Sequence, residues 1–201
     1  MSALAELYRK IAACRDCEEL ARTRTQTVPG EGPEKPQIVF IGEAPGYHED
    51  QQGRPFVGQA GQFLEQLLNS IGLKRSDVYI CNVIKCRPPN NRDPLPIEIK
   101  NCQKWLDQQL ELLSAKMIVT LGRYSLARFF PGEPISKIHG KARKQDNIIY
   151  FAMYHPAAAL HQQSLRQTIE ADMLKIPPLL AQAEPEGEIK KEDKPQQLSM
   201  F

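Results

Sequence analysis

The stretch IVFIGEAPG, residues 38–46, places four apolar residues directly before a turn that carries an acidic side chain. A short apolar run bounded by glycine and proline is typical of a buried parallel strand. Three more short apolar runs follow at residues 78–84, 117–121 and 148–153. We therefore predict four strands of one sheet, the first of which covers residues 38–41.

Predicted helices separate these strands. Residues 3–13 and 60–71 carry apolar side chains on one helical face, and residues 96–114, 122–130 and 162–176 are also predicted to be helical. Strands that alternate with helices indicate the α/β class, here a three-layer α/β/α sandwich around a short, mostly parallel, four-stranded sheet. The loops at the carboxyl ends of such strands carry function. Glu43, Asn82 and His155 lie in or beside these loops.

Proline, glycine and polar residues predict loops at residues 27–36, 86–94 and 131–147, and in the stretch that ends near residue 58. We expect one domain over residues 1–181. Residues 182–201 are rich in Glu, Lys, Pro and Gln, which is typical of a disordered tail.

Composition and charge limit the function classes. No apolar run approaches the roughly 20 residues that span a bilayer, and the start of the chain lacks the pattern of a signal peptide. We expect a cytoplasmic protein, and a monomer because no long apolar stripe is left unexplained. The net charge is +2, while residues 183–201 hold five acidic and three basic side chains. The basic excess therefore lies in the rest of the chain, which is compatible with a phosphate-binding face.

Five cysteines in a cytoplasmic protein do not suggest a disulfide framework. Cys14 and Cys17 form a CxxC half-site, and Cys86 and Cys102 supply two further thiols. Four thiolates suit zinc or an iron–sulfur cluster, and their spacing does not distinguish the two. Colour does, because an iron–sulfur protein is brown and a zinc protein is colourless. Cys81 lies within an apolar strand and is interpreted as a buried hydrophobic residue.

Taken together, five motifs resemble the family 4 uracil-DNA glycosylases. They are GEAPG at 42–46, GRPFVG at 53–58, NVIKCRPP at 82–89, NNR at 90–92 and YHP at 154–156. The resemblance covers residues 1–175, and the four cysteines fall where that family holds a [4Fe–4S] cluster. It implies a base-excision repair enzyme that flips uracil out of DNA, hydrolyses its N-glycosidic bond and leaves an abasic site. The cluster would have a structural role beside the DNA-facing loop.

The resemblance also implies how uracil is recognised. Phe56 would stack on the flipped ring, and Asn82 would donate to O4 and accept from N3–H. Cytosine presents the opposite pattern, so it would leave the amide mispaired. Glu49, in the loop 46–49, is the candidate barrier against the methyl group of thymine.

The chemistry implied by the resemblance falls to three residues. His155, which also belongs to the uracil-binding set, would stabilise the uracil anion at O2. Glu43 would orient water and oppose the positive charge on the sugar. Family 1 enzymes have an aspartate just after this position, where this chain has Ala44, another uracil-binding candidate. Asn91 is therefore expected to share the positioning of water.

DNA contacts are expected in the loops. Basic side chains that suit phosphates occur at Lys85, Arg87 and Arg92, and at Lys137 and Lys141 in the loop 137–144. Leu160 resembles a residue that fills the gap left by the flipped base, and its alternative is core packing. Four residues of the tail, Gln197, Leu198, Met200 and Phe201, resemble a peptide that binds the bacterial sliding clamp.

Two other functions stay open at this point. One is a relative of the same superfamily that acts on another deaminated base, such as hypoxanthine or xanthine, although Asn82 favours uracil. The other is a non-catalytic DNA- or clamp-binding module with a structural metal, which would release no free uracil from DNA.

Overall fold

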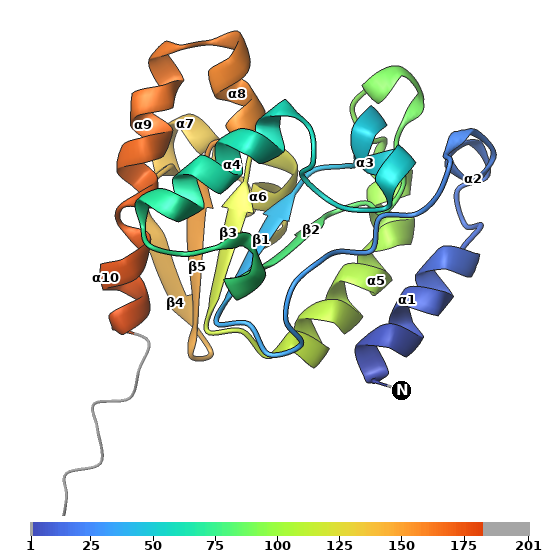
Figure 1. Ribbon diagram of the computed structural model, residues 1–201, viewed down its shortest axis with the longest axis horizontal. Coiled ribbons are helices and arrows are strands. Elements are labelled where there is room, and N and C mark those ends of the chain that lie inside the picture. Colours follow the sequence, from blue (N-terminus) through green and yellow to red (C-terminus); the bar gives the residue numbers. More distant parts are fainter. Residues whose placement is uncertain (1, 183–201) are drawn as a thin grey trace, which may run out of the picture.

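A twisted sheet forms the middle layer of the computed structural model, which describes residues 2–182 (Figure 1). Its strands lie in the order β2-β1-β3-β5-β4. Strands β2, β1, β3 and β5 are parallel, and β4 pairs antiparallel with β5. The bounds of the strands are Ile38–Gly42 (β1), Tyr79–Asn82 (β2), Met117–Leu121 (β3), Ala142–Gln145 (β4) and Ile148–Met153 (β5).

Helices cover both faces of this sheet (Figure 1). Two short 3-10 turns, Arg75–Asp77 and Pro89–Asn91, flank β2 and the loop that follows it. The α-helices are Ala3–Ala13 (α1), Glu18–Thr23 (α2), Tyr47–Gln52 (α3), Gln59–Ser70 (α4), Pro96–Leu113 (α5), Arg123–Phe129 (α6), Ile135–Ile138 (α7), Pro156–His161 (α8), Ser164–Met173 (α9) and Ile176–Ala181 (α10).

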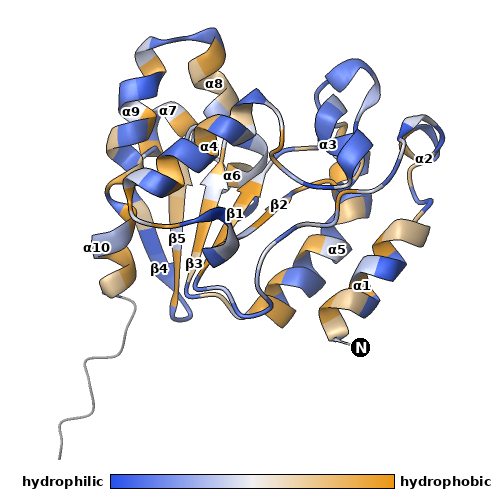
Figure 2. Cartoon of the chain, viewed as in Figure 1, coloured by the Kyte–Doolittle hydropathy of each residue, from blue (hydrophilic) through white to orange (hydrophobic). Residues whose placement is uncertain are grey.

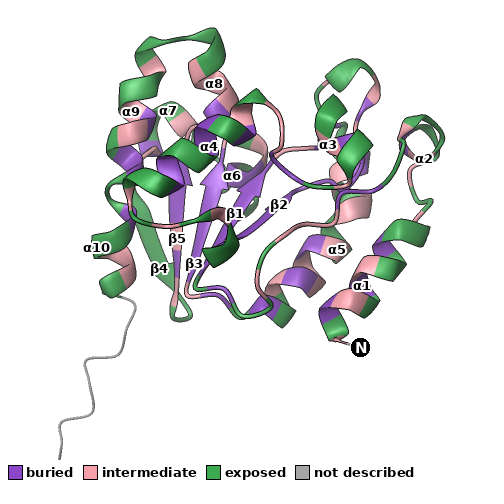
Figure 3. Ribbon diagram, in the orientation of Figure 1, coloured by how far each residue is buried: buried purple, intermediate pink, exposed green. Residues whose placement is uncertain are grey.

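Helices bury the sheet on both faces. Successive strand residues point to opposite sides, so each strand contributes side chains to two cores. Phe40 belongs to the core that contains Phe63 and Leu67 of α4. Its neighbours in β1, Val39 and Ile41, belong to a second core with side chains of α1 and α5. Strands β1, β2, β3 and β5 are accordingly hydrophobic and buried along most of their length, whereas β4 is hydrophilic and exposed (Figures 2 and 3). This confirms the three-layer α/β/α fold.

The sheet has five strands, and the prediction of four was wrong. The additional strand, β4, lies inside the stretch 131–147 that was predicted to be a loop. All four of its residues are exposed and none alternates with a buried apolar side chain, because it forms the edge of the sheet. The turn into β5 uses Asp146 and Asn147, which both have positive φ, as a tight hairpin requires.

Other segments also differ from the prediction. Part of the polar stretch before residue 58 forms the short helix α3. The predicted last helix, 162–176, corresponds to α9, while α8 precedes it and α10 begins at its end. No helix within residues 2–182 is both long and apolar enough to cross a membrane. The predicted clamp-binding residues Gln197, Leu198, Met200 and Phe201 lie outside the described residues.

The strand order locates the candidate site. From β1 the chain first adds β2 on one side, and then adds β3 on the other. Helices that follow these strands leave a crevice at their carboxyl ends, where open α/β sheets bind ligands. Glu43, Asn82 and the segment Tyr154–His155 all lie at this end of the sheet.

Candidate functional site

An open cleft of ≈ 780 Å³ lies at the carboxyl ends of β1, β3 and β5. Its walls include five residues that the sequence predicted to be functional: Glu43, Ala44, Asn91, Arg92 and His155. Pro88 and the segment 91–93 form one rim, and α8 forms another. The cleft is large enough for a nucleotide that has left the DNA stack.

Asn82 and Phe56 lie together beside Gly42, at the end of β1. A Cβ added at Gly42 would stand 2.4 Å from Asn82 Oδ1 and 2.6 Å from Phe56 Cζ, so only glycine fits there. Both side chains are buried, at 1% and 6% exposure. Asn82 Oδ1 has no hydrogen-bond partner within the described part of the chain. A buried acceptor without a donor is costly, so this oxygen is a candidate to accept a hydrogen bond from a ligand.

The rings of Phe56 and His155 lie against each other, with centroids 5.4 Å apart and planes at 25°. The backbone N–H of Ala157 donates to His155 Nδ1 at 3.1 Å. In the neutral ring, the proton must therefore be on Nε2, which becomes a donor. Burial lowers the pKa of His155 to about 4, although the negative charge of Glu49 opposes this shift. The imidazole is thus neutral near pH 7.

Glu43 is half-buried where β1 opens into the cleft. Burial raises the pKa of its carboxyl group, repulsion from Asp93 raises it further, and Arg123 opposes both effects. Asp93 and Arg123 form an ion pair and also line the cleft. Neither residue was predicted from the sequence, although Asp93 directly follows the motif at 90–92 and Arg123 lies two residues after the predicted strand 117–121.

Glu49 is near this site but engaged with the backbone. Its Oε1 accepts hydrogen bonds from the N–H groups of Val57 and Gly58, both at 2.9 Å. Its Oε2 lies close to Gly46, where an added Cβ would stand 2.8 Å from it. The carboxylate therefore connects the loop after β1 to the turn that carries Phe56.

Lys85 is not available to DNA, so its prediction as a phosphate ligand was wrong. The side chain is 1% exposed, and its Nζ donates to the carbonyl oxygen of Asn82 at 2.7 Å. This hydrogen bond holds the ammonium group of Lys85 against the last residue of β2. Lys85 instead stabilises the segment that positions Asn82.

The two arginines of this loop have protein partners. Arg87 donates from Nε to Asn91 Oδ1 at 2.7 Å, and its guanidinium lies 5.0 Å from the centre of the exposed Tyr47 ring. Arg92 bridges Glu19 and Glu98, each at 2.7 Å. Two carboxylates neutralise the charge of Arg92, which makes it a weaker phosphate ligand than Arg87.

Three further predicted DNA contacts lie outside the walls of the cleft. Lys137 and Lys141 are exposed on either side of the turn after α7, and neither lines the cleft. Leu160 is on α8, the helix that forms one rim, and is 47% exposed. This exposure excludes the alternative that Leu160 is part of the core.

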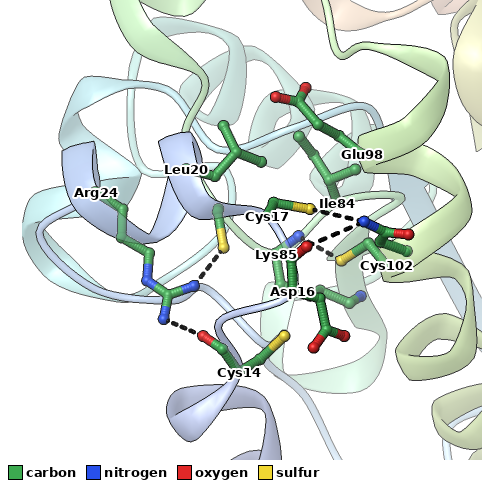
Figure 4. A pocket seen from close by; sticks show the side chains of 11 residues that line it. Cys14, Asp16, Cys17, Leu20, Arg24, Ile84, Lys85, Glu98 and Cys102 are labelled. Carbon is green, nitrogen blue, oxygen red and sulfur yellow. Dashed lines mark hydrogen bonds between the residues drawn. The ribbon is translucent and has the colours of Figure 1, made fainter.

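Cys14, Cys17, Cys86 and Cys102 line one cavity between α1, α2, the loop after β2 and α5 (Figure 4). Cys81 is not among the lining residues and is fully buried in the core, as predicted. Each of the four sulfurs accepts one hydrogen bond. The donors are Trp105 Nε1 to Cys14, Asn101 Nδ2 to Cys17, Arg24 Nη1 to Cys86 and the backbone N–H of Lys85 to Cys102.

The hydrogen bonds to these sulfurs suit a metal-bound group, because sulfur that accepts N–H hydrogen bonds is suited to the negative charge of a metal-bound thiolate. Four cysteines that line one cavity are the ligand set of a structural zinc ion or of an iron–sulfur cluster. Within residues 2–182, no three histidine, cysteine or acidic side chains are placed closely enough to hold a single metal ion as they stand.

Comparison with known proteins agrees with this geometry. A family model described as the uracil DNA glycosylase superfamily matches residues 29–175. The chain is 45% identical over 194 residues to a type-4 uracil-DNA glycosylase of Archaeoglobus fulgidus, covering 92% of this chain and 97% of the relative. Two similar proteins are the type-4 uracil-DNA glycosylases of Sulfurisphaera tokodaii and Thermotoga maritima. The first is 47% identical over 88% of this chain and 84% of the relative, and the second is 41% identical over 87% of this chain and 92% of the relative.

Proposed function

The chain belongs to the uracil DNA glycosylase superfamily, and on this basis we propose that its cleft excises uracil from DNA during base-excision repair, as in the type-4 enzymes. The enzyme hydrolyses the N-glycosidic bond, so its products are free uracil and an abasic site.

The buried, unpartnered Oδ1 of Asn82 is the observation that best supports uracil as the base. The N3–H of uracil supplies the missing donor, and the amide nitrogen of Asn82 donates to O4. Cytosine has an acceptor at N3, which would face the same oxygen. Asn82 thus selects uracil by leaving a wrong base with unpaired polar groups.

Phe56 provides the ring on which the flipped uracil stacks, since it adjoins both Asn82 and His155. Glu49, near the start of α3, is hydrogen-bonded to the turn that holds Phe56 and lies close to Gly46. We propose it as the barrier against the methyl group of thymine. Its two backbone hydrogen bonds fix the carboxylate, so it cannot rotate away from a larger base.

His155 stabilises the departing uracil anion. Ala157 N–H occupies Nδ1, so the neutral ring donates from Nε2, the role we propose toward uracil O2. A neutral donor is suited to this task, because it needs no proton transfer from solvent and keeps its proton as charge develops on the base.

Water capture is shared between Glu43 and Asn91, which line the same cleft. Glu43 orients water, and its negative charge stabilises the positive charge that develops on the sugar. The next residue, Ala44, has no carboxylate that could assist it. Asn91 is held by Arg87, whose Nε donates to its Oδ1. This leaves the amide nitrogen of Asn91 for the water.

Glu43→Gln and Asn91→Ala are each expected to keep part of the activity, with single-turnover rates about 10- to 100-fold below wild type. Because the pKa of Glu43 is raised, the wild-type rate should increase with pH as this carboxyl ionises, and Glu43→Gln should lack that dependence. Complete inactivation by Glu43→Gln with uracil binding intact would instead assign all water activation to one carboxylate.

DNA binding is proposed for basic side chains at or beyond the walls of the cleft and for one exposed apolar side chain on its rim. Arg87, Lys137 and Lys141 suit phosphates, Arg92 contributes less because of its two carboxylate partners, and Leu160 fills the space left by the flipped base. Binding should weaken with salt, and an affinity for DNA that is independent of salt would reject the phosphate contacts.

The cysteine cavity is proposed to hold a [4Fe–4S] cluster through Cys14, Cys17, Cys86 and Cys102. When bound, such a cluster ties the N-terminal helices and α5 to the loop between Asn82 and Asn91. These cysteines are separate from the cleft, so their role is structural. A brown protein with iron and sulfide in equal amounts is expected, and a colourless protein that contains zinc would reject the cluster.

The tail residues Gln197, Leu198, Met200 and Phe201 are proposed to dock on a sliding clamp. Deleting residues 197–201 should abolish clamp binding in a pull-down and leave excision from short oligonucleotides unchanged. Clamp binding that survives the deletion would reject this partner site.

Release of labelled uracil from an oligonucleotide tests the function as a whole. We expect release from uracil-containing DNA and none from matched oligonucleotides that carry thymine or cytosine. Preferred release of hypoxanthine or xanthine would indicate a relative with another substrate, and no release of any base would indicate a non-catalytic module.

A further inference from the structure

The backbone of Phe56 adopts a conformation that needs external support. Its φ is +52°, in the left-handed region that L-residues with side chains rarely adopt. Such a conformation persists only where the surrounding structure fixes it. Residues 55–58, called the Phe56 turn below, therefore depend on their neighbours.

Arg75 holds the carbonyl side of the Phe56 turn. Its Nη1 donates to the carbonyl oxygen of Phe56 at 2.9 Å, and its Nη2 donates to that of Pro55. The same guanidinium donates from Nε and Nη2 to Glu31 Oε2, at 3.2 and 2.9 Å. The side chain of Arg75 is only 17% exposed, so these bonds are largely shielded from water.

The Phe56 turn has little room to relax on its other sides. Glu49 accepts from the N–H groups of Val57 and Gly58, as described above. Helix α4 approaches so closely that a Cβ added at Gly61 would stand 1.9 Å from the carbonyl oxygen of Phe56. Arg75 adds hydrogen bonds to the carbonyl oxygens of Pro55 and Phe56, to which Glu49 and α4 donate none in the described part of the chain.

Arg75 and Glu31 are both tied to β2, the strand that ends at Asn82. The N–H of Glu31 donates to Ile80 O at 2.9 Å, and the N–H of Ile80 donates to Glu31 O at 2.8 Å. Arg75 begins the 3-10 turn that leads into β2. The pair therefore connects the strand that presents the base-reading amide to the turn that presents the stacking ring.

We propose that Arg75, oriented by Glu31, is a positioning residue that sets the ring of Phe56 against the uracil held by Asn82. This inference rests on the proposed function. Arg75 acts through the two carbonyls of the Phe56 turn, and its loss should let the backbone leave the left-handed region. The ring would then be misplaced for stacking.

Arg54 provides a matched control. It donates from Nε and Nη2 to the other oxygen of Glu31, at 3.2 and 2.7 Å. It is 52% exposed, and among the described residues its guanidinium bonds only to Glu31. Arg54→Gln and Arg75→Gln therefore each remove one arginine from the same carboxylate, but only the second frees the Phe56 turn.

The test compares wild type, Arg54→Gln, Arg75→Gln and Arg75→Lys by single-turnover excision, by inhibition with free uracil and by Tm. Arg75→Gln is expected to lower the excision rate about 100-fold and to weaken inhibition by uracil. The reason is that a substrate-positioning group displaced by about 1 Å lowers a reaction rate by about 100-fold. Arg75→Lys should recover part of both, since an ammonium can reach one carbonyl. Arg54→Gln should stay within about twofold of wild type, as expected for an exposed ion pair.

Equal losses in Arg54→Gln and Arg75→Gln would overturn the proposal, as would a wild-type rate and uracil inhibition in Arg75→Gln. If Arg75→Gln does not fold, Arg75→Lys decides: a reduced rate with weaker uracil inhibition supports the proposal, and wild-type values overturn it. A wild-type enzyme that releases no uracil would contradict the proposed function instead, so the two failures are distinguishable.

Discussion

Asn82→Ala is expected to lower kcat/KM for uracil excision about 1,000-fold while leaving the Tm unchanged or slightly raised. The loss of activity corresponds to about 4 kcal/mol, since the variant lacks two buried hydrogen bonds to the base. The Tm should not fall, because the folded protein without a base carries the cost of an unpartnered buried oxygen, about 1–3 kcal/mol, which alanine removes.

Gln109 is the matched control for this prediction. Its Oε1 is likewise buried without a partner, but its Nε2 donates to Tyr79 Oη and to Pro29 O, both at 2.9 Å. Gln109→Leu should therefore lower the Tm and leave the activity of the folded enzyme intact. Activity and Tm are to be measured on both variants. A large fall in Tm for Asn82→Ala with little loss of activity would show that Asn82 has a structural role.

The prediction of the fold succeeded where strands are buried on both faces. The runs at 38–41, 117–121 and 148–153 are apolar because the cores of both layers enclose them. Strand β4 could not be predicted in this way, since its exposed residues carry no apolar alternation. The pair Asp146 and Asn147 was the available signal, because both residues tolerate positive φ in a tight turn.

The site was predictable to the extent that strand ends bring motifs together. Glu43 and His155 line one cleft because β1 and β5 end at the same edge of the sheet. Lys85 was misassigned because the sequence does not show that its Nζ turns back to Asn82 O. The pairing of Arg75 with Glu31 joins residues 44 positions apart, so no local pattern could reveal it.

His155→Ala is expected to reduce the single-turnover rate about 100- to 1,000-fold, the usual effect of removing one donor to a developing oxyanion. His155→Gln should recover part of this loss, since its amide can donate to the same oxygen. Binding of uracil-free DNA should be unchanged in both variants and provides the control. A His155→Ala rate close to wild type would reject the role of this residue in stabilising the uracil anion.

The lowered pKa of His155 also predicts how stability depends on pH. A histidine in the unfolded chain binds a proton near pH 6.5, whereas His155 in the folded protein binds one only near pH 4. Between these values the unfolded state binds more protons, so stability falls as the pH falls from about 6.5 to about 4. At pH 5 this cost is about 2 kcal/mol, and His155→Gln should lack it. Urea unfolding at pH 7 and pH 5 measures the difference. If wild type and His155→Gln lose equal stability between these two pH values, the ring is not held neutral, and its role as a neutral donor from Nε2 must be abandoned.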